Sequence, residues 1–271
     1  MKKNIGLVLM VAGMVSLAAC GSESNKNEVG SAADQAEVVI GLDDTFVPMG
    51  FRDKDGELTG FDIELSQAIF DLTDTKVTYQ PIEWAMKEAE LDNGTIDMIW
   101  NGYSKTTERE EKVLFSDTYM ENLQLLVTPK SSGITEFSAM SGKKLGAQEG
   151  SSGYNTFNNE PEVLKDMVDG NDATLYASFN EAFIDLENGR IDGLLIDRVY
   201  AEYYLTSTGK LEEYNLIDST FDQEDYAVGV RKDDQALADK INAGLKELQE
   251  NGTFAEISMK WFGLFLCMKG K

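Results

Sequence analysis

A short segment of this chain occurs twice at a domain-length spacing, which limits the folds that the chain can adopt. LDNGTID at 91–97 recurs as LENGRID at 186–192, an offset of 95 residues from 91 to 186. Each copy is interpreted as the end of a helix, because Asn-Gly supplies the left-handed cap that glycine adopts readily, followed directly by a buried strand. Two such units at this distance predict two lobes of like topology.

Strand and helix patterns alternate along the rest of the chain. The β-branched run Val38–Leu42 is typical of a buried strand. Further strands are predicted at 76–79 and 96–100, and helices at 61–72, 85–91, 199–205, 235–250 and 254–261. The helix at 61–72 places one apolar face at Phe61, Leu65, Ala68, Ile69 and Leu72. This alternation predicts an α/β architecture with mostly parallel sheets, in which ligands bind beyond the carboxyl ends of the strands, here at 43–46, 101–104, 150–152 and 197.

The segment Asp53-Lys54-Asp55-Gly56-Glu57 is interpreted as a tight hairpin turn, since Asp-Gly is a strong turn pair. A calcium loop is the alternative, but the remaining ligand positions and the distal Glu of an EF-hand are missing. The hairpin turn is therefore the prediction.

The first 19 residues have the plan of a secretory signal. Lys2 and Lys3 precede an apolar run over 5–18, which is shorter than the about 20 residues of a membrane-spanning helix. The run ends in Leu17-Ala18-Ala19-Cys20, which resembles the lipobox of bacterial lipoproteins and implies a lipidated Cys20; an ordinary signal peptide with an incidental Cys is the alternative. Residues 20–36 are predicted to be the lipidated Cys and a flexible tether on the outer face of the bacterial cytoplasmic membrane.

The composition excludes several classes of function. With 24 basic and 48 acidic residues the net charge is −24, which repels nucleic acid, so no nucleic-acid partner is expected. The sequence contains no histidine, which excludes Ser-His-Asp and Cys-His nucleophile systems and the commonest zinc ligand. The two cysteines are Cys20 and Cys267, so lipidation of Cys20 would leave no disulfide. The body after the tether is expected to be soluble, with neither a cofactor nor a metal ion.

Arg109 is the strongest candidate for binding an anion. It lies in Ser104-Lys105-Thr106-Thr107-Glu108-Arg109, directly after the predicted strand at 96–100. Thr106 can cap a helix that starts at 107, and the fork geometry of arginine suits a carboxylate. The alternative is that Arg109 pairs with its neighbours Glu108, Glu110 and Glu111.

Three other positions at strand ends are less specific. Asp197 follows an apolar run and can hold an ammonium, or else cap the helix at 199–205. The small residues at 150–153 can expose backbone N–H groups to an anion. Phe46 and Trp84 can supply flat walls for a ligand side chain, or belong to the core.

These motifs, in this order, resemble the polar-amino-acid substrate-binding proteins of bacterial ABC importers, the extracellular solute-binding proteins of family 3. The resemblance runs from about Val38 to Gly263. It is carried by Gly41-Leu42-Asp43 with Pro48, Gly56–Asp62, Gly94 with Ile96-Asp97, Ser104–Arg109 with Phe115-Ser116-Asp117 and Tyr119, Gly142–Gly146 with Gly150, Gly189–Asp192 with Asp197, and Asn251-Gly252-Thr253 with Trp261-Phe262-Gly263.

The resemblance implies an α/β fold of the two-lobed periplasmic-binding-protein type (type II), with a hinge of two crossing strands. Lobe 1 would comprise residues 37–126 and 224–263, and lobe 2 residues 127–223. Residues 264–271 would be an apolar tail of unknown role, where members of the family usually have a polar end.

The resemblance also implies how the ligand is held. Arg109 would hold the ligand α-carboxylate, with backbone groups near Ser151 and Ser152 completing the grip from the other lobe. Asp197 would bind the α-ammonium, helped by the backbone at Gly102 and the side chain of Ser104.

Around the ligand side chain, the resemblance places Phe46 and Trp84 at the flanks and Asp43 near the far end. Trp100-Asn101-Gly102 stands where many members have smaller residues, so Asn101 joins the predicted site and could suit an amide. Asp43 and Glu83 beside the two aromatics could suit a cation. The expected order of ligands is arginine, lysine or histidine, then glutamine, with cystine or a small peptide behind.

The sequence therefore predicts a lipid-anchored, monomeric receptor that delivers a polar amino acid to the membrane permease and ATPase subunits of an ABC importer. One alternative is an enzyme on the same scaffold, such as a dehydratase or lytic transglycosylase, with a carboxylate as acid or base. The other is a sensory or adhesive surface module.

Overall fold

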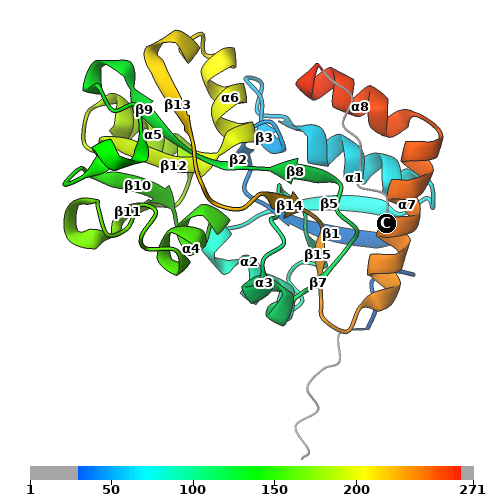
Figure 1. The fold of residues 1–271 in the computed structure, drawn as a ribbon. Helices are drawn as coiled ribbons and strands as arrows, with labels where there is room; N and C mark the ends of the chain where they lie inside the picture. The colour runs from blue at the N-terminus through cyan, green and yellow to red at the C-terminus, as the bar shows by residue number, and fades with distance from the viewer. Residues whose placement is uncertain (1–29, 264–271) are drawn as a thin grey trace, which may run out of the picture.

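The computed structural model describes residues 30–263, which form two halves joined by two short strands (Figure 1). The predictions for the signal segment, for Cys20 and for the tail at 264–271 lie outside the described residues. Within residues 30–263, no helix has both the length and the apolar composition that crossing a bilayer requires.

Each half is built on a five-stranded sheet with the same strand order. The first sheet runs β5 (Lys76–Pro81), β1 (Glu37–Leu42), β6 (Met98–Ile99), β15 (Gly229–Val230) and β7 (Leu114–Phe115). The second runs β11 (Ala173–Tyr176), β10 (Leu145–Gln148), β12 (Gly193–Asp197), β9 (Gln124–Pro129) and β13 (Tyr214–Asp218). The like topology that the repeat predicted is therefore present in the structure.

In both sheets the first three strands are parallel, and the fourth is antiparallel to both of its neighbours. The register is set in the first sheet by Ile40 opposite Tyr79 and Met98, and in the second by Leu145 opposite Ala173 and Gly193. The prediction of mostly parallel sheets thus holds for strand direction, but one strand of each sheet runs against the others.

The antiparallel fourth strands, β9 and β15, come directly after the two connections between the halves in the sequence. β8 (Met120–Asn122) leads from β7 into β9, and β14 (Glu224–Tyr226) leads from β13 into β15. The two pair antiparallel, with Glu224 opposite Asn122, and lie in the middle of the molecule (Figure 1). The predicted lobe boundary between 126 and 127 falls inside β9, and the division of the chain into these lobes stays a prediction.

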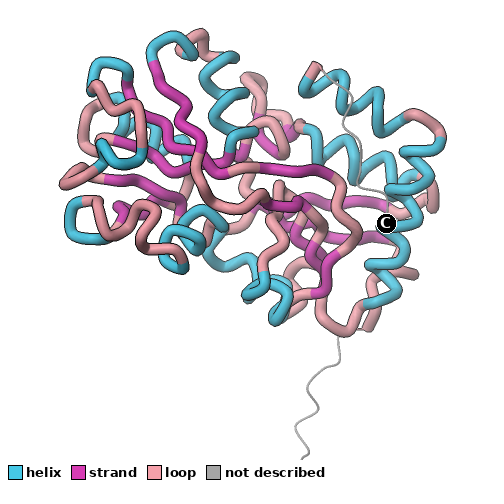
Figure 2. The backbone as a smooth tube through the Cα atoms, in the orientation of Figure 1, coloured by secondary structure: helices cyan, strands magenta, loops and turns pink. Residues whose placement is uncertain are grey.

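Helices lie outside the strands in both halves (Figure 2). They are α1 (Phe61–Asp71), α2 (Lys87–Asp92), α3 (Thr107–Lys112), α4 (Ser152–Asn159), α5 (Phe179–Glu187), α6 (Arg198–Ser207), α7 (Gln235–Glu250) and α8 (Thr253–Phe262). Short 3₁₀ turns are at Trp84–Met86, Lys130–Ser132, Phe137–Met140, Asp169–Asn171 and Leu211–Glu213. The helices α1, α7 and α8 contact one another beside the first sheet.

Several predicted elements have other bounds in the structure, and three of them are informative. The helix predicted at 61–72 ends at Asp71, and Leu72 is 48% exposed because it lies beyond the last turn. The helix predicted at 85–91 begins as a 3₁₀ turn and becomes α-helical at Lys87. The strand predicted at 96–100 forms ladder pairs at Met98 and Ile99 alone. The prediction that Leu72 belongs to the apolar face is therefore wrong, and in all three elements backbone hydrogen bonding decides where the element ends.

The predicted hairpin at 53–57 joins β3 (Gly50–Arg52) to β4 (Leu58–Thr59), with β2 (Thr45–Phe46) on the other side of β3. The N–H of Asp53 donates to the carbonyl of Glu57 at 2.9 Å. The carboxylate of Asp53 accepts the N–H groups of Asp55 and Glu57, so this acidic side chain fixes the turn itself.

The two copies of the repeat make the same contacts. Gly94 and Gly189 both have the left-handed backbone, with φ of 81° and 66°. The carboxylate of Asp97 accepts the N–H of Val39 at 2.9 Å, and that of Asp192 accepts the N–H of Lys144 at 2.8 Å. Each aspartate therefore ties its own strand to the neighbouring central strand.

We expect Asp97→Asn to lower the free energy of unfolding by about 2 kcal/mol, and Asp192→Asn by less than about 1 kcal/mol. Both changes weaken the same bond to a backbone N–H. Asp97 additionally forms a buried ion pair with Arg231, whose Nη2 lies 3.1 Å from Oδ1. Urea unfolding of the two variants tests this, and equal losses would contradict it.

Candidate functional site

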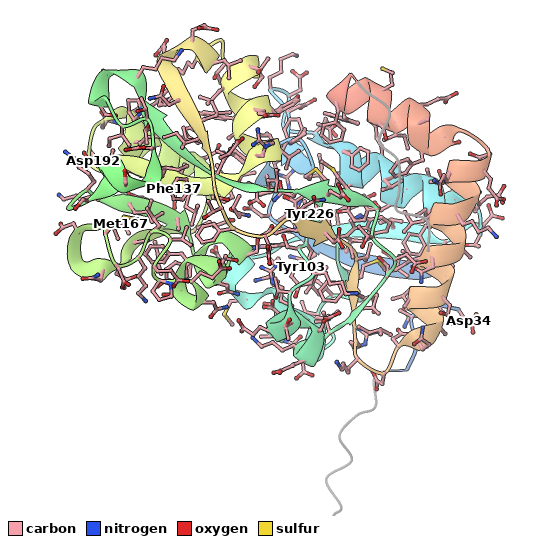
Figure 3. All side chains as sticks on the ribbon, in the orientation of Figure 1. Asp34, Tyr103, Phe137, Met167, Asp192 and Tyr226 are labelled. Atoms are coloured by element: carbon pink, nitrogen blue, oxygen red, sulfur yellow. The ribbon has the colours of Figure 1, made fainter. Side chains whose placement is uncertain are left out.

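A small, nearly filled cavity of about 10 Å³ lies between the two halves. Seven of the ten predicted ligand-binding residues line it, together with Gln148, which the sequence did not indicate. The lining residues are Phe46, Trp84, Gly102 and Arg109 from the half that carries the first sheet, and Gln148, Ser151, Ser152 and Asp197 from the other. Tyr103 and Tyr226 lie in this central region, whereas Asp192 lies at the outer edge (Figure 3).

Arg109 reaches the cavity from the short helix α3, which begins where the sequence predicted. The hydroxyl of Thr106 accepts the N–H of Arg109 at 3.2 Å and so caps the helix. The guanidinium is buried over the ring of Tyr103, 4.5 Å from its centre. It donates to the carbonyl of Ser104 at 2.8 Å and, across the cleft, to the carbonyl of Gly150 at 3.0 Å.

The alternative in which Arg109 pairs with its neighbouring glutamates is wrong. Glu108 pairs with Lys112 at 2.7 Å, and Glu110 pairs with Lys105 at 3.2 Å. The carboxylate near Arg109 is Glu88, 3.9 Å from Nε. The guanidinium therefore lies in the cleft, whereas Glu108 and Glu110 form their ion pairs at the surface.

Lys87 is a buried cation beside Arg109 that the sequence did not indicate. Its ammonium donates to the carbonyls of Trp84 at 3.1 Å and Gly150 at 2.9 Å, and lies 3.3 Å from Glu88. Burial, with a further contribution from Arg109, lowers the pKa of Lys87 to about 7. Burial acts to raise the pKa of Glu88, but the charges of Lys87 and Arg109 and the hydrogen bond from Tyr103 together lower it.

Asp197 ends strand β12, and its carboxylate points inward. Its Oδ1 accepts hydrogen bonds from Asn122 at 2.6 Å, Tyr226 at 2.8 Å and Gln124 at 2.9 Å. Asp197 occupies the N-cap position of α6, but its side chain makes no capping bond, so the helix-cap alternative is wrong for the carboxylate. Burial, and then the charge of Glu224, raise the pKa of Asp197 to about 7.

Ser151 and Ser152 lie at the start of α4, directly after β10. The hydroxyl of Ser151 accepts the N–H of Tyr154 at 3.1 Å and caps the helix. The hydroxyl of Ser152 lies 3.1 Å from that of Ser104, which belongs to the other half. Ser104 itself does not line the cavity. Gly150 precedes them with a φ of 72°, and a Cβ there would come within 2.9 Å of the Ala85 backbone. Glycine at this position lets the two halves approach closely.

Asp43 and Asn101 are buried but do not line the cavity. Oδ1 of Asn101 accepts the N–H of Asp43 at 3.1 Å. The Asp43 carboxylate accepts the N–H and hydroxyl of Thr45 and, from the other half, the amide of Gln148 at 2.8 Å. Burial raises the pKa of Asp43. Gln148 therefore connects Asp43 to the cavity.

Phe46 and Trp84 combine both of the roles considered for them, since they are buried and also line the cavity. Phe46 packs against Tyr200 and Phe179 of the other half, with ring centres 5.5 Å and 6.0 Å away. Trp84 packs edge-on against Tyr103.

Gly102 is held by a buried carboxylate. Its N–H donates to Asp62 Oδ2 at 2.7 Å, and the hydroxyl of Tyr119 donates to the same oxygen at 3.0 Å. Gly102 has a φ of 56°, and a Cβ would come within 2.9 Å of the Phe46 ring. Burial raises the pKa of Asp62 to about 7, although both donors oppose this.

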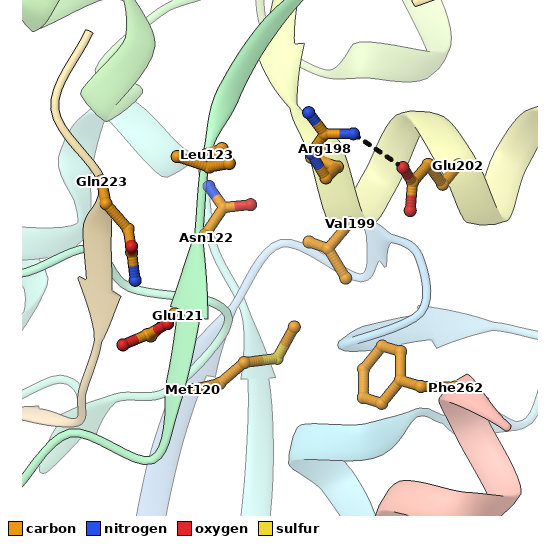
Figure 4. Close-up of a pocket in the computed structure, with 9 residues that line it drawn as sticks. All are labelled: Met120, Glu121, Asn122, Leu123, Arg198, Val199, Glu202, Gln223 and Phe262. Carbon is orange, nitrogen blue, oxygen red and sulfur yellow. Dashed lines mark hydrogen bonds and ion pairs between the residues drawn. The ribbon is translucent and has the colours of Figure 1, made fainter. Parts of the chain in front are cut away.

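A larger pocket of about 290 Å³ lies between β8, the start of α6 and the end of α8 (Figure 4). Its apolar lining comes from Met120, Leu123, Val199 and Phe262, and Arg198 pairs with Glu202 at its edge. None of the predicted site residues lines it. The cavity that contains Arg109 and Asp197 is therefore the candidate functional site.

Comparison with known proteins finds one family along almost the whole chain. Residues 38–264 match the model of the bacterial extracellular solute-binding proteins, family 3. The chain is 31% identical over 258 residues to the L-cystine-binding protein TcyJ of Escherichia coli K12, covering 94% of this chain and 92% of that protein. It is 28% identical over 259 residues to the arginine-binding extracellular protein ArtP of Bacillus subtilis, covering 94% and 97%.

Solved structures give the same result. An ABC uptake transporter substrate-binding protein from Streptococcus pneumoniae with bound histidine is 55% identical, with a TM-score of 0.86 over 88% of this chain and 96% of that one. An ancestral arginine-binding protein bound to arginine is 34% identical, with a TM-score of 0.77 over 84% and 99%. The fold of this chain is thus that of two-lobed amino-acid-binding proteins.

We expect Asp62→Asn to change how stability depends on pH. Because burial raises the pKa of Asp62, its contribution to stability is fully present below about pH 4 and is lost as pH rises through about 7. The variant should therefore gain about 2 kcal/mol relative to the parent protein between pH 5 and pH 7. Guanidinium unfolding at both pH values measures this. Asp71→Asn, at the exposed end of α1, is the control, and an equal response of the two variants would contradict the prediction.

Proposed function

The chain belongs to the bacterial extracellular solute-binding proteins of family 3, and on that premise we propose that it captures a polar amino acid between its two lobes and passes it to an ABC importer. The family, the two-lobed α/β fold and the expectation that the chain is not an enzyme are confirmed by the comparisons. The enzyme alternative is therefore set aside.

The observation that carries the proposal is one cavity with opposite charges on its two sides. Arg109 reaches it from one lobe and Asp197 from the other, and both side chains are buried. An amino acid has a carboxylate and an ammonium on the same carbon. It therefore satisfies both groups at once and bridges the lobes.

We assign the ligand contacts accordingly. Arg109 holds the α-carboxylate, with backbone N–H groups at Ser151 and Ser152, since the N-terminus of α4 attracts an anion. Asp197 holds the α-ammonium with the backbone of Gly102 and the hydroxyl of Ser104. Phe46 and Trp84 flank the ligand side chain, and Gln148, Asp43 and Asn101 lie toward its far end.

These contacts are sufficient for binding and for closure. A hydrogen bond to a charged group contributes about 1.5–3 kcal/mol, and a neutral one about 0.5–1.5 kcal/mol. Two charged groups and a few neutral ones therefore reach the about −8 kcal/mol of a micromolar complex. Because the closed form alone makes both sets of contacts, the ligand favours closure, which a permease can recognise.

The charges around the cavity favour a cationic ligand. Asp43, Asp197 and Glu224 are buried carboxylates near it, whereas the buried cations are Arg109 and Lys87, next to Glu88. An additional positive charge lowers the cost of burying the excess carboxylates. The proposed order of preference among ligands is arginine, lysine or histidine first, then glutamine, and then cystine or a small peptide. Relatives named for cystine, arginine and glutamine, and the neighbour with bound histidine, span this range.

The membrane attachment is also a proposal. The family is extracellular, and Cys20 after the signal segment supplies the lipid anchor. The receptor then works as a monomer beside the permease and ATPase subunits of its importer.

A thermal-shift screen against the common amino acids, cystine and short peptides tests the function. We expect a selective rise in melting temperature, since a ligand stabilises the folded state to which it binds. Arg109→Ala should weaken binding of every amino acid at least 100-fold, because the α-carboxylate loses its charged partner. Arg190→Ala, at a surface ion pair with Asp185, is the control and should change nothing. Undiminished affinity of Arg109→Ala would refute the site.

Asp43→Asn tests the side-chain end of the pocket. We expect affinity for arginine to fall about 5- to 20-fold, because a cationic side chain loses a buried counter-charge, and affinity for glutamine to change less than about twofold. Asp44→Asn, next in the chain and paired with Arg52, is the matched control. Calorimetric titration with both ligands measures the effect, and an equal loss for the two would contradict it.

A further inference from the structure

Glu224 is a buried carboxylate on the hinge strand β14 that neither the motifs nor the proposed contacts use. Its Oε2 accepts hydrogen bonds from Ser104 at 2.6 Å and Ser152 at 3.0 Å, which come from the two lobes. It also accepts from Gln124 at 3.1 Å and Asn122 at 3.2 Å. Four donors from both lobes and the other crossing strand thus converge on one oxygen.

Glu224 and Asp197 are held side by side by shared donors. The amide nitrogen of Asn122 lies 2.6 Å from Asp197 Oδ1 and 3.2 Å from Glu224 Oε2. The amide nitrogen of Gln124 lies 2.9 Å and 3.1 Å from the same two oxygens. The two carboxylates are therefore immediate neighbours, and the donors are the last residue of β8 and the first residue of β9.

The other ionisable groups near the pair are Tyr226 and Arg109. The Tyr226 hydroxyl donates to Asp197, and burial keeps its pKa well above the ordinary value, so it remains a donor. Arg109 attracts Asp197, but its guanidinium hydrogen bonds go to Ser104 and Gly150. Oε1 of Glu224 is buried and has no hydrogen-bond partner within residues 30–263. The pair therefore lacks a full counter-charge from the protein.

Two adjacent buried carboxylates rarely ionise together, because burial and mutual repulsion both disfavour the second charge. A single positive charge between them removes the repulsion. A proton can supply this charge, and so can an ammonium group.

We propose that Glu224 and Asp197 together form the ammonium subsite and share one positive charge, which is a proton in the free protein and the ligand ammonium in the complex. The inference rests on the proposed function, which assigns the ammonium to Asp197 alone. On binding, the ligand ammonium replaces the proton and forms ionic hydrogen bonds to the two carboxylates. The displaced proton passes to the solvent. No covalent bond of the ligand changes.

The exchange makes binding depend on pH. Burial and the charge of Glu224 raise the pKa of Asp197 to about 7, so below that pH a proton lies at Asp197 in the free protein and the ligand must displace it. Affinity should therefore rise about tenfold from pH 6 to pH 8 for a single exchanged proton with a midpoint near 7. Lys87 lies beside the expected place of the ligand carboxylate and would take up a proton when the ligand binds. This uptake opposes the proton release from the carboxylate pair, so each variant is compared with the parent protein.

The test is calorimetric titration of the mature chain with L-arginine, L-lysine and L-glutamine, whose side chains do not titrate in this range, at pH 6, 7 and 8. Buffers of different ionisation enthalpy give the number of protons released. At pH 6 the parent protein should release more protons per ligand than Glu224→Gln, by up to about 0.9, because the variant loses the neighbouring charge but keeps the burial that raises the pKa of Asp197. The difference should fall to about 0.1 or less at pH 8. Glu121→Gln, exposed on β8, should match the parent protein.

Several outcomes separate the claims. Equal proton release by the parent protein and Glu224→Gln would overturn the shared subsite while leaving the receptor function intact. Failure of every amino acid to bind would instead refute the function, and the inference with it. If Glu224→Gln does not fold, Glu224→Asp and Lys87→Met replace it. Lys87→Met must then release close to one proton at pH 6, and its failure to do so would overturn the inference.

Discussion

The pairing of β8 with β14 is the interaction on which the rest of the structure depends. The chain passes between the lobes along these two strands, and each then enters a sheet as its reversed strand. The same short ladder carries Asn122, Glu224 and Tyr226, whose polar atoms surround Asp197. Lobe connection and ligand chemistry are therefore built from the same residues, so the lobes cannot move without moving these groups.

Burial of charge is the second physical theme. The cleft buries Arg109, Lys87, Asp43, Asp197 and Glu224. The two cations donate hydrogen bonds to the opposite lobe, and the three carboxylates accept them from the opposite lobe or the hinge. Burying charges is costly unless they are paired. The arrangement consequently favours a small zwitterionic or cationic ligand, which supplies the missing partners in the closed form.

Sequence patterns predicted the parts of the molecule that depend on local rules. The repeat at 91–97 and 186–192 predicted like topology, because Asn-Gly caps and buried strands are local features. The Ser-x-Thr-x-x-Arg segment placed Arg109 at a helix start. Lys87, Gln148 and Glu224 escaped prediction, because their neighbours in space come from distant segments. A lysine on a short helix and a glutamate in an acidic chain have the spacing of surface residues, and only the meeting of the lobes buries them.

The strand order of the first sheet has a consequence for how the chain folds. β15, near residue 230, lies between β6 and β7, so β7 pairs with this sheet through β15. The second sheet, by contrast, uses one continuous stretch from β9 to β13. As the chain is synthesised from its N-terminus, the second lobe can complete its sheet first. The sheet of the first lobe lacks β15 until residues more than 100 positions beyond β7 have been made. Such contacts of high sequence separation form late.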